Sequence, residues 1–241
     1  EIKNKGKNIC VAMVISLCPA GHLFATENNP NNDNKFMEEN LNLIQEWDKT
    51  FPQSDKVNHK KITFHNRYGI TLAADLYVPK NVTGKLPAIA ISGPFGAVKE
   101  QASGLYAQTL AERGFLTIAF DPSYTGESSG QPRYVASPDI NTEDFSAAVD
   151  YLSTRDDVDA ERIGILGICG WGGMALNAAA IDTRIKATVT ATMYDMSRVN
   201  ANGYFDSMNA DARHELRRQL NAQRTEDYRN GTFALGGGVV A

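Results

Sequence analysis

The segment over residues 163–173, Ile-Gly-Ile-Leu-Gly-Ile-Cys-Gly-Trp-Gly-Gly, restricts the possible folds more than any other part of the chain. Its first half is an apolar run typical of a buried strand, and a helix of small residues is predicted soon after it, over residues 172–181. The glycines between the two predict a sharp strand-to-helix turn with Cys169 at its corner. Such a turn lifts one side chain above the sheet, and the positive end of the following helix favours the thiolate form of a cysteine.

Strands and helices alternate on both sides of this turn. Apolar or alternating runs predict strands over residues 62–64, 70–78, 86–92, 115–120, 162–168 and 185–193. Helical patterns lie between them, over residues 101–113, over 142–153 with Asn141 as the N-cap, and over 172–181. This alternation predicts an α/β fold with a mostly parallel sheet that helices cover on both faces.

The N-terminus has the pattern of an export signal. Three lysines within the first seven residues precede an apolar run over residues 9–15, which predicts a secretory signal peptide over residues 1–25. We therefore expect an exported protein, periplasmic or extracellular. Cys18 leaves a lipoprotein as the weaker alternative, and an ordinary amphipathic or buried first helix is another.

Polar segments flank the predicted core. Residues 28–34 form an asparagine-rich linker, and apolar residues at helical spacing predict an amphipathic helix over 35–49. Residues 206–224 predict a helix with a narrow apolar stripe, which is more typical of a lid than of a core helix. We therefore divide the chain into four regions: a signal peptide (1–25), a polar linker with an N-terminal helix (26–60), the core (61–195) and a lid-like segment (196–241).

Charge and cysteine content narrow the function classes. The chain has 24 basic and 28 acidic side chains and a net charge of −4, with no basic patch for nucleic acid and no basic helix for a membrane surface. A small-molecule enzyme or binding module fits this balance better. Cys10 and Cys18 fall in the predicted signal, so Cys169 is left without a disulfide partner, as a buried apolar residue or a functional thiol.

The turn around Cys169 resembles the nucleophile elbow of α/β-hydrolases. Its Gly-x-Cys form is similar to dienelactone hydrolases and to small bacterial hydrolases near the X-Pro peptidase branch. The resemblance covers residues 61–195 and includes the segments 75–79, 93–96 and 121–130. It implies a three-layer sandwich that hydrolyses a carboxylic ester, a lactone or a related acyl substrate without a cofactor or metal. Asp121 is expected to organise its own glycine-rich loop rather than to react.

The resemblance also assigns roles to single residues. Cys169 matches the nucleophile, and the backbone N–H groups of Phe95 and Gly170 match the two donors of the oxyanion hole. Asp195 is the candidate acid and His214 the candidate base.

Two departures from the family pattern accompany these assignments. Trp171 stands where the family has a small residue, which puts the geometry of the elbow in doubt. The family order is nucleophile, acid and then histidine near the end of the domain, but His214 lies in the predicted lid helix and Asp195 comes one strand early. We therefore expect that the last strands, with the histidine and the acid, lie beyond Ala241, and that this chain has little or no activity.

Two other function classes stay open. A hydrolase fold can serve as a non-catalytic binding protein, in which Cys169 would be structural. Four glycines after a strand suggest a nucleotide-binding loop, Gly164, Gly167 and Gly170 with Gly172, although the Gly-x-Gly-x-x-Gly spacing is not met before Gly170. The oligomeric state does not follow from the sequence.

Overall fold

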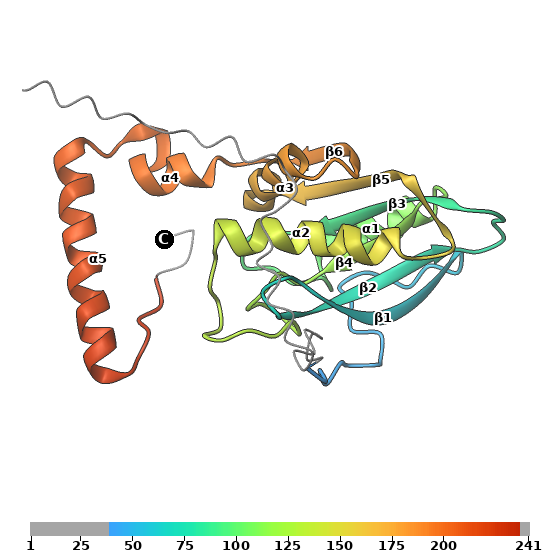
Figure 1. The fold of residues 1–241 in the computed structure, drawn as a ribbon, viewed down its shortest axis with the longest axis horizontal. Helices are drawn as coiled ribbons and strands as arrows, with labels where there is room; N and C mark the ends of the chain where they lie inside the picture. Colours follow the sequence, from blue (N-terminus) through green and yellow to red (C-terminus); the bar gives the residue numbers. More distant parts are fainter. Residues whose placement is uncertain (1–38, 237–241) are drawn as a thin grey trace, which may run out of the picture. The chain divides into compact units, whose positions relative to one another are not determined.

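The computed structural model describes residues 39–236, and a mixed sheet of six strands organises them (Figure 1). The strands lie in the order β1-β2-β4-β3-β5-β6. β2 is antiparallel to both β1 and β4, whereas β4, β3, β5 and β6 run parallel to one another. The strands are β1 (Val57–His65), β2 (Thr71–Pro79), β3 (Leu86–Ser92), β4 (Leu116–Phe120), β5 (Val158–Ile168) and β6 (Ile185–Ala191).

Helices pack on both faces of the sheet, because the central strands are apolar on both sides. Ile163 and Ile165 of β5 belong to a core cluster with helices α2 (Pro138–Ser153) and α3 (Gly170–Ile181). Leu166 and Ile168 of the same strand belong to a second cluster with helix α1 (Ala102–Ala111). The predicted three-layer α/β fold with a mostly parallel sheet is therefore confirmed.

The predicted elements of the core are present, with shifted ends. Strand 86–92 has the predicted bounds, whereas β1 begins at Val57, before the predicted start of the core. Helix α2 begins earlier than predicted, because Ser137 and not Asn141 is its N-cap and Pro138 takes the first helical position. Asn141 is instead buried, and its amide oxygen accepts the N–H of Ser137 at 2.9 Å.

The predicted helix over 35–49 is wrong in its described part, since residues 39–50 contain no helix. Tertiary contacts hold this segment instead: the N–H of Ile44 donates to the Glu127 carboxylate at 2.8 Å, and the Trp47 indole N–H donates to the carbonyl of Phe51 at 2.8 Å. These contacts outweigh the local helical pattern. The predicted signal peptide and the asparagine-rich linker lie outside the described residues.

Three short or exposed elements follow the sheet. They are α4 (Met196–Asn202), the 3₁₀ turn η1 (Tyr204–Asp206) and α5 (Ala210–Asn230). The helix predicted from residue 206 begins later, because Phe205 and Asp206 have positive φ angles of 56° and 55° and cannot continue a right-handed helix. None of the residues of α5 is buried. No helix among residues 39–236 is long and apolar enough to cross a membrane.

Candidate active site

Cys169 forms the sharp corner between β5 and α3 that the sequence predicts. Its backbone has φ 57° and ψ −126°, a conformation that residues other than glycine rarely adopt. The Cys169 N–H donates to the carbonyl of Ala191 at the end of β6 at 2.8 Å, and the Cys169 carbonyl accepts the N–H of Gly172 at 3.0 Å. The side chain is half-buried and not enclosed in the core. The thiol is thus held at the carboxyl end of the parallel strands, at the N-terminus of a helix.

The glycines around Cys169 allow the strand and the helix to approach closely. A Cβ atom at Gly167 would lie 2.3 Å from the carbonyl oxygen of Trp171, and one at Gly170 would lie 2.6 Å from the ring of Phe95. Gly164 lies within β5, where a Cβ atom would be 3.1 Å from the carbonyl of Ala187 in β6. Packing within the turn and the sheet accounts for these glycines, so they give no support to the nucleotide-binding interpretation.

The loop between β3 and α1 lies against the turn and carries Phe95. A Cβ atom at Gly93 would lie 2.4 Å from the carbonyl of Ile168, so this loop begins in contact with the end of β5. The N–H groups of Phe95 and Gly170 donate no hydrogen bond within residues 39–236. Both predicted oxyanion donors are therefore unengaged, and the elements that carry them are in contact.

Trp171 does not disturb the turn, because its side chain points into the core. It is 4% exposed, and its ring meets the ring of Phe95 edge-on with 4.5 Å between the centroids. The indole N–H has no hydrogen-bond partner in the described part of the chain. The large residue that departs from the family pattern thus joins the Phe95 loop to the turn by an aromatic contact.

The candidate acid and base lie in exposed helices. Asp195 is the N-cap of α4, and its carboxylate accepts the Ser197 hydroxyl at 2.6 Å and the Arg198 N–H at 2.9 Å. The Ser197 hydroxyl is the main cause that lowers the pKa of Asp195. His214 lies on the exposed helix α5. No hydrogen bond or ion pair joins Asp195 to a histidine in the described part of the chain, so their catalytic roles stay predictions.

The other described histidines lie far across the sheet. His59 and His65 are both in β1, which three strands separate from β5. His59 is hydrogen-bonded to Asp75 at 2.8 Å. These two residues therefore do not contribute to the corner at Cys169.

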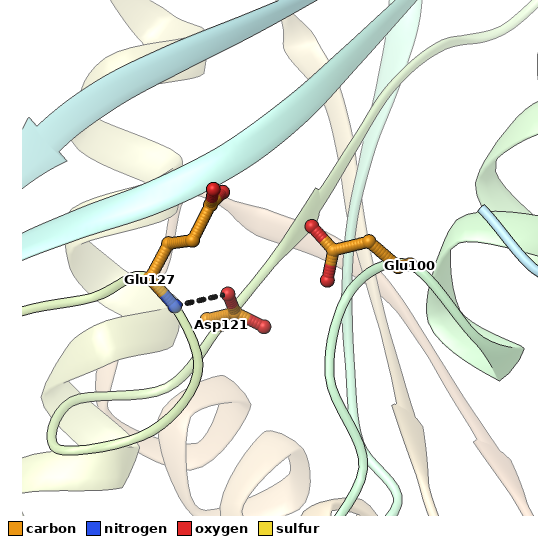
Figure 2. A group of neighbouring side chains, drawn as sticks. All are labelled: Glu100, Asp121 and Glu127. Carbon is orange, nitrogen blue, oxygen red and sulfur yellow. Dashed lines mark hydrogen bonds between the residues drawn. The ribbon is translucent and has the colours of Figure 1, made fainter. Parts of the chain in front are cut away.

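A buried ion-pair network lies beside the Phe95 loop, and no pattern in the sequence predicts it. Its centre is Lys99, whose side chain is fully buried and whose ammonium contacts Glu100 at 2.5 Å, Asp121 at 2.9 Å and Glu127 at 2.6 Å. Figure 2 shows the three carboxylates, which extend from the segment before α1, the end of β4 and the loop after β4. Lys61 of β1 also contacts Glu127, at 2.8 Å.

Lys99 occupies the place that a cation would take among these carboxylates. One oxygen of each of Glu100, Asp121 and Glu127 lies within 4.8 Å of the others, a spacing that a metal ion could use. The ammonium of Lys99 already contacts all three residues, so the positive charge among these carboxylates comes from the chain itself. Burial alone would lower the pKa of Lys99, but the carboxylates outweigh it, with Asp121 contributing most, and raise that pKa.

Asp121 organises the loop after β4, as the sequence predicts. Its carboxylate accepts the N–H of Lys99 at 2.8 Å and the N–H of Glu127 at 2.9 Å. A Cβ atom at Gly126 would lie 2.2 Å from the same carboxylate. The residue is completely buried, and burial is the main cause that raises its pKa, against the opposing effect of Lys99.

Comparison with known proteins agrees with this architecture. The uncharacterized protein PA2218 of Pseudomonas aeruginosa is 69% identical over 195 residues, which are 80% of this chain and 53% of that protein. Its crystal structure matches with a TM-score of 0.80 and 66% identity, covering 83% of this chain and 65% of that one. The uncharacterized protein YcjY of Escherichia coli is 43% identical over 181 residues, 74% of this chain and 59% of that protein.

A more distant relative has a named activity. The thiohydrolase aneE of Aspergillus aculeatus is 29% identical over 137 residues, which are 57% of this chain and 42% of that protein. This chain thus spans about half the length of the curated relatives that it matches. The sequence profile of X-Pro dipeptidyl-peptidases (S15 family) matches residues 68–233. The chain, with its α/β-hydrolase fold, therefore belongs to the X-Pro dipeptidyl-peptidase (S15) family.

Proposed function

We propose that this chain is an acyl hydrolase in which Cys169 is the nucleophile. The observation that carries the proposal is the corner at Cys169, where a strained backbone holds a half-buried thiol at the start of α3. Strain of this kind persists where the surrounding structure enforces it, and it is concentrated at functional sites. A structural cysteine needs neither the strained backbone nor the exposure.

The chemistry follows from the groups around the corner. The Cys169 thiolate attacks the carbonyl carbon of an ester, a lactone or a thioester, and a C–S bond forms as the carbonyl oxygen becomes negative. The free N–H groups of Phe95 and Gly170 donate hydrogen bonds to that oxygen, and the positive end of α3 stabilises its negative charge. The C–O or C–S bond to the leaving group then breaks, the leaving group takes a proton from water, and an acyl-thioester remains on Cys169.

Hydrolysis of the acyl-thioester needs a base to activate water. His59 and His65 lie in β1, which three strands separate from β5, and His214 lies on the exposed helix α5, so we expect acylation of this chain to be faster than deacylation. The relative that is named a thiohydrolase supports an acyl substrate, including a thioester, for this branch of the family. The substrate is a small acyl compound in this proposal.

The test is acylation of Cys169 by p-nitrophenyl acetate. We expect a burst of up to one equivalent of p-nitrophenolate and one acetyl group on the peptide that contains Cys169, measured by mass spectrometry. Cys10 and Cys18 are replaced by alanine in all samples so that only one thiol can react. The variant Cys169→Ala is the control and should show no burst.

Iodoacetamide separates the alternatives, because alkylation of a thiol produces no oxyanion. If iodoacetamide modifies Cys169 in the folded chain but the ester does not acetylate it, the chain is a binding protein on a hydrolase fold. If neither reagent reacts until the chain is unfolded, Cys169 is a structural residue. Either result contradicts the proposal.

A further inference from the structure

The network around Lys99 connects the two loops that flank the candidate site. Lys99 lies in the loop between β3 and α1, four residues after Phe95, and Asp121 directly follows β4. The N–H and the ammonium of Lys99 bind the two oxygens of the Asp121 carboxylate, at 2.8 Å and 2.9 Å. The Asp121 N–H in turn donates to the carbonyl of Ala73 in β2 at 2.9 Å. The loop that carries Phe95 is thus joined through Lys99 to the rigid centre of the sheet.

Few other hydrogen bonds hold this loop. Its bonds from Ala97 and Gln101 stay within the loop itself, and the carbonyl of Glu100 accepts the N–H of Thr50 from the segment before β1. Among the described residues, the hydrogen bonds of Lys99 are those that connect this loop to Asp121, directly after β4, and to Glu127 in the loop that follows. Lys99 and the contact with Trp171 therefore both help to place the Phe95 N–H relative to the sheet, and Lys61 of β1 bonds to the Glu100 side chain near the end of the loop at 3.3 Å.

We propose that Lys99 is a positioning residue for the oxyanion hole, because its buried ammonium and its amide fix the Phe95 loop against the end of β4. The proposal rests on the proposed function, in which Phe95 and Gly170 donate to the oxyanion. The Gly170 N–H is already fixed by α3 and β5. The position of the Phe95 N–H therefore decides how the two donors are spaced around the oxyanion. Lys99 does not touch the substrate and acts only through the loop.

The ammonium suits this role better than a neutral group. Its three N–H donors match three carboxylates, one from each of the segments that meet here. All three distances are short, and the side chain of Lys99 has no exposed surface. A buried charge with this many partners holds its neighbours in one arrangement, because any displacement leaves a carboxylate unpaired.

The experiment compares two lysines of the same network. Lys99→Met removes the ammonium bonds between the Phe95 loop and the carboxylates, Asp121 included, and leaves the backbone N–H of residue 99, which also donates to Asp121. Lys61→Met removes an equal charge that also contacts Glu100 and Glu127, at 3.3 Å and 2.8 Å, but has no bond to Asp121. Because each change leaves carboxylates unpaired, both are also made together with Glu127→Gln, which removes one of the shared acceptors.

Three rates are measured for each variant in the 241-residue chain. They are acylation of Cys169 by p-nitrophenyl acetate, alkylation of Cys169 by iodoacetamide, and backbone hydrogen exchange in the peptide over residues 93–101. For the Lys99 variants we expect acylation to slow by about tenfold, less than the loss caused by removing a donor outright, while alkylation changes by less than about twofold. Hydrogen exchange in the loop should accelerate. The Lys61 variants should show none of these changes beyond about twofold.

The experiment distinguishes failure of the positioning role of Lys99 from failure of the proposed function. Equal slowing of acylation in the Lys99 and Lys61 variants, or parallel losses in acylation and alkylation, would overturn the positioning role. If the unmodified chain is not acylated, the proposed function fails, and the hydrogen exchange of the loop alone decides whether Lys99 holds it. If both Lys99 variants fail to fold, Asp121→Asn decides the question, because it weakens the bonds between Lys99 and the end of the sheet and leaves Lys99 and Glu127 in place. Acylation slowed by about threefold relative to Lys61→Met supports the proposal, and no slowing overturns it.

Discussion

The strained backbone of Cys169 predicts that glycine at this position is more stabilising than alanine, the reverse of the order in a helix interior. At φ 57° and ψ −126° any residue with a Cβ atom is disfavoured, but glycine is not. We therefore expect the variant Cys169→Gly to be more stable than Cys169→Ala. In a helix interior, by contrast, glycine is less stable than alanine by about 1 kcal/mol.

The magnitude follows from two opposing effects. Relief of the strained backbone contributes about 1–3 kcal/mol in favour of glycine. The larger freedom of glycine in the unfolded chain takes back about 0.4–1 kcal/mol. We expect the free energy of unfolding of Cys169→Gly to exceed that of Cys169→Ala by about 1.3 kcal/mol, the midpoint of a range of about 0–2.6 kcal/mol. Both variants lose the sulfur, so its packing does not enter the difference.

The assay is urea unfolding of both variants, followed by circular dichroism, with the denaturant slopes checked for equality. Since Cys169 is also the N-cap of α3, the ordinary preference of N-caps for glycine over alanine must be subtracted. The pair Ser137→Gly and Ser137→Ala provides this control, because Ser137 is the N-cap of α2 with an unstrained φ of −126°. A difference at Cys169 no larger than that at Ser137 would refute the reasoning from strain.

Two further predictions concern the turn and the network. Gly167→Ala should destabilise the chain by more than about 2 kcal/mol in thermal or urea unfolding, because the new methyl would meet the backbone of Trp171 at 2.3 Å and backbone cannot easily move; a loss below about 0.5 kcal/mol would contradict this. For Asp48, burial is outweighed by hydrogen bonds from Lys49 and Lys61, which lower its pKa from 3.8 to about 2. The ionised Asp48 carboxylate therefore stabilises the folded chain above about pH 4, and this stabilisation is lost as the pH falls toward 2. After screening by solvent, it amounts to about 1 kcal/mol of the free energy of unfolding. Asp48→Asn should remove that part of the pH dependence of unfolding, and an unchanged profile between pH 4 and pH 2 would contradict the assignment.

The sequence predicts the core well because burial on both faces leaves a simple pattern. Residues 86–92 form an uninterrupted apolar strand, and only a strand between two layers of helices needs such a run. The turn at Cys169 is equally predictable from the sequence, because close packing of strand and helix leaves room only for glycine at Gly167 and Gly170. Local chemistry and the final structure agree in these segments.

Prediction fails where contacts distant in sequence decide the structure. The pattern over 35–49 is helical, but Asp48 and Lys49 lie in a buried network with Asp75 and Lys61, so the described part of that segment is not a helix. Lys99 was missed for the same reason. A lysine next to a glutamate is usually a solvated pair, and its partners from the end of β4 and the following loop become neighbours only after folding.

The ion-pair network also determines how far the chain can be shortened. The predicted core begins at residue 61, yet Asp48 and Lys49 supply contacts to Lys61 and Asp75 from the preceding segment. A chain trimmed to start at residue 61 would expose the side of the sheet that these residues cover and leave the Asp75 carboxylate without its lysine. An expression fragment intended to preserve the corner at Cys169 should therefore retain Asp48 and Lys49, and also Ile44, whose N–H donates to Glu127.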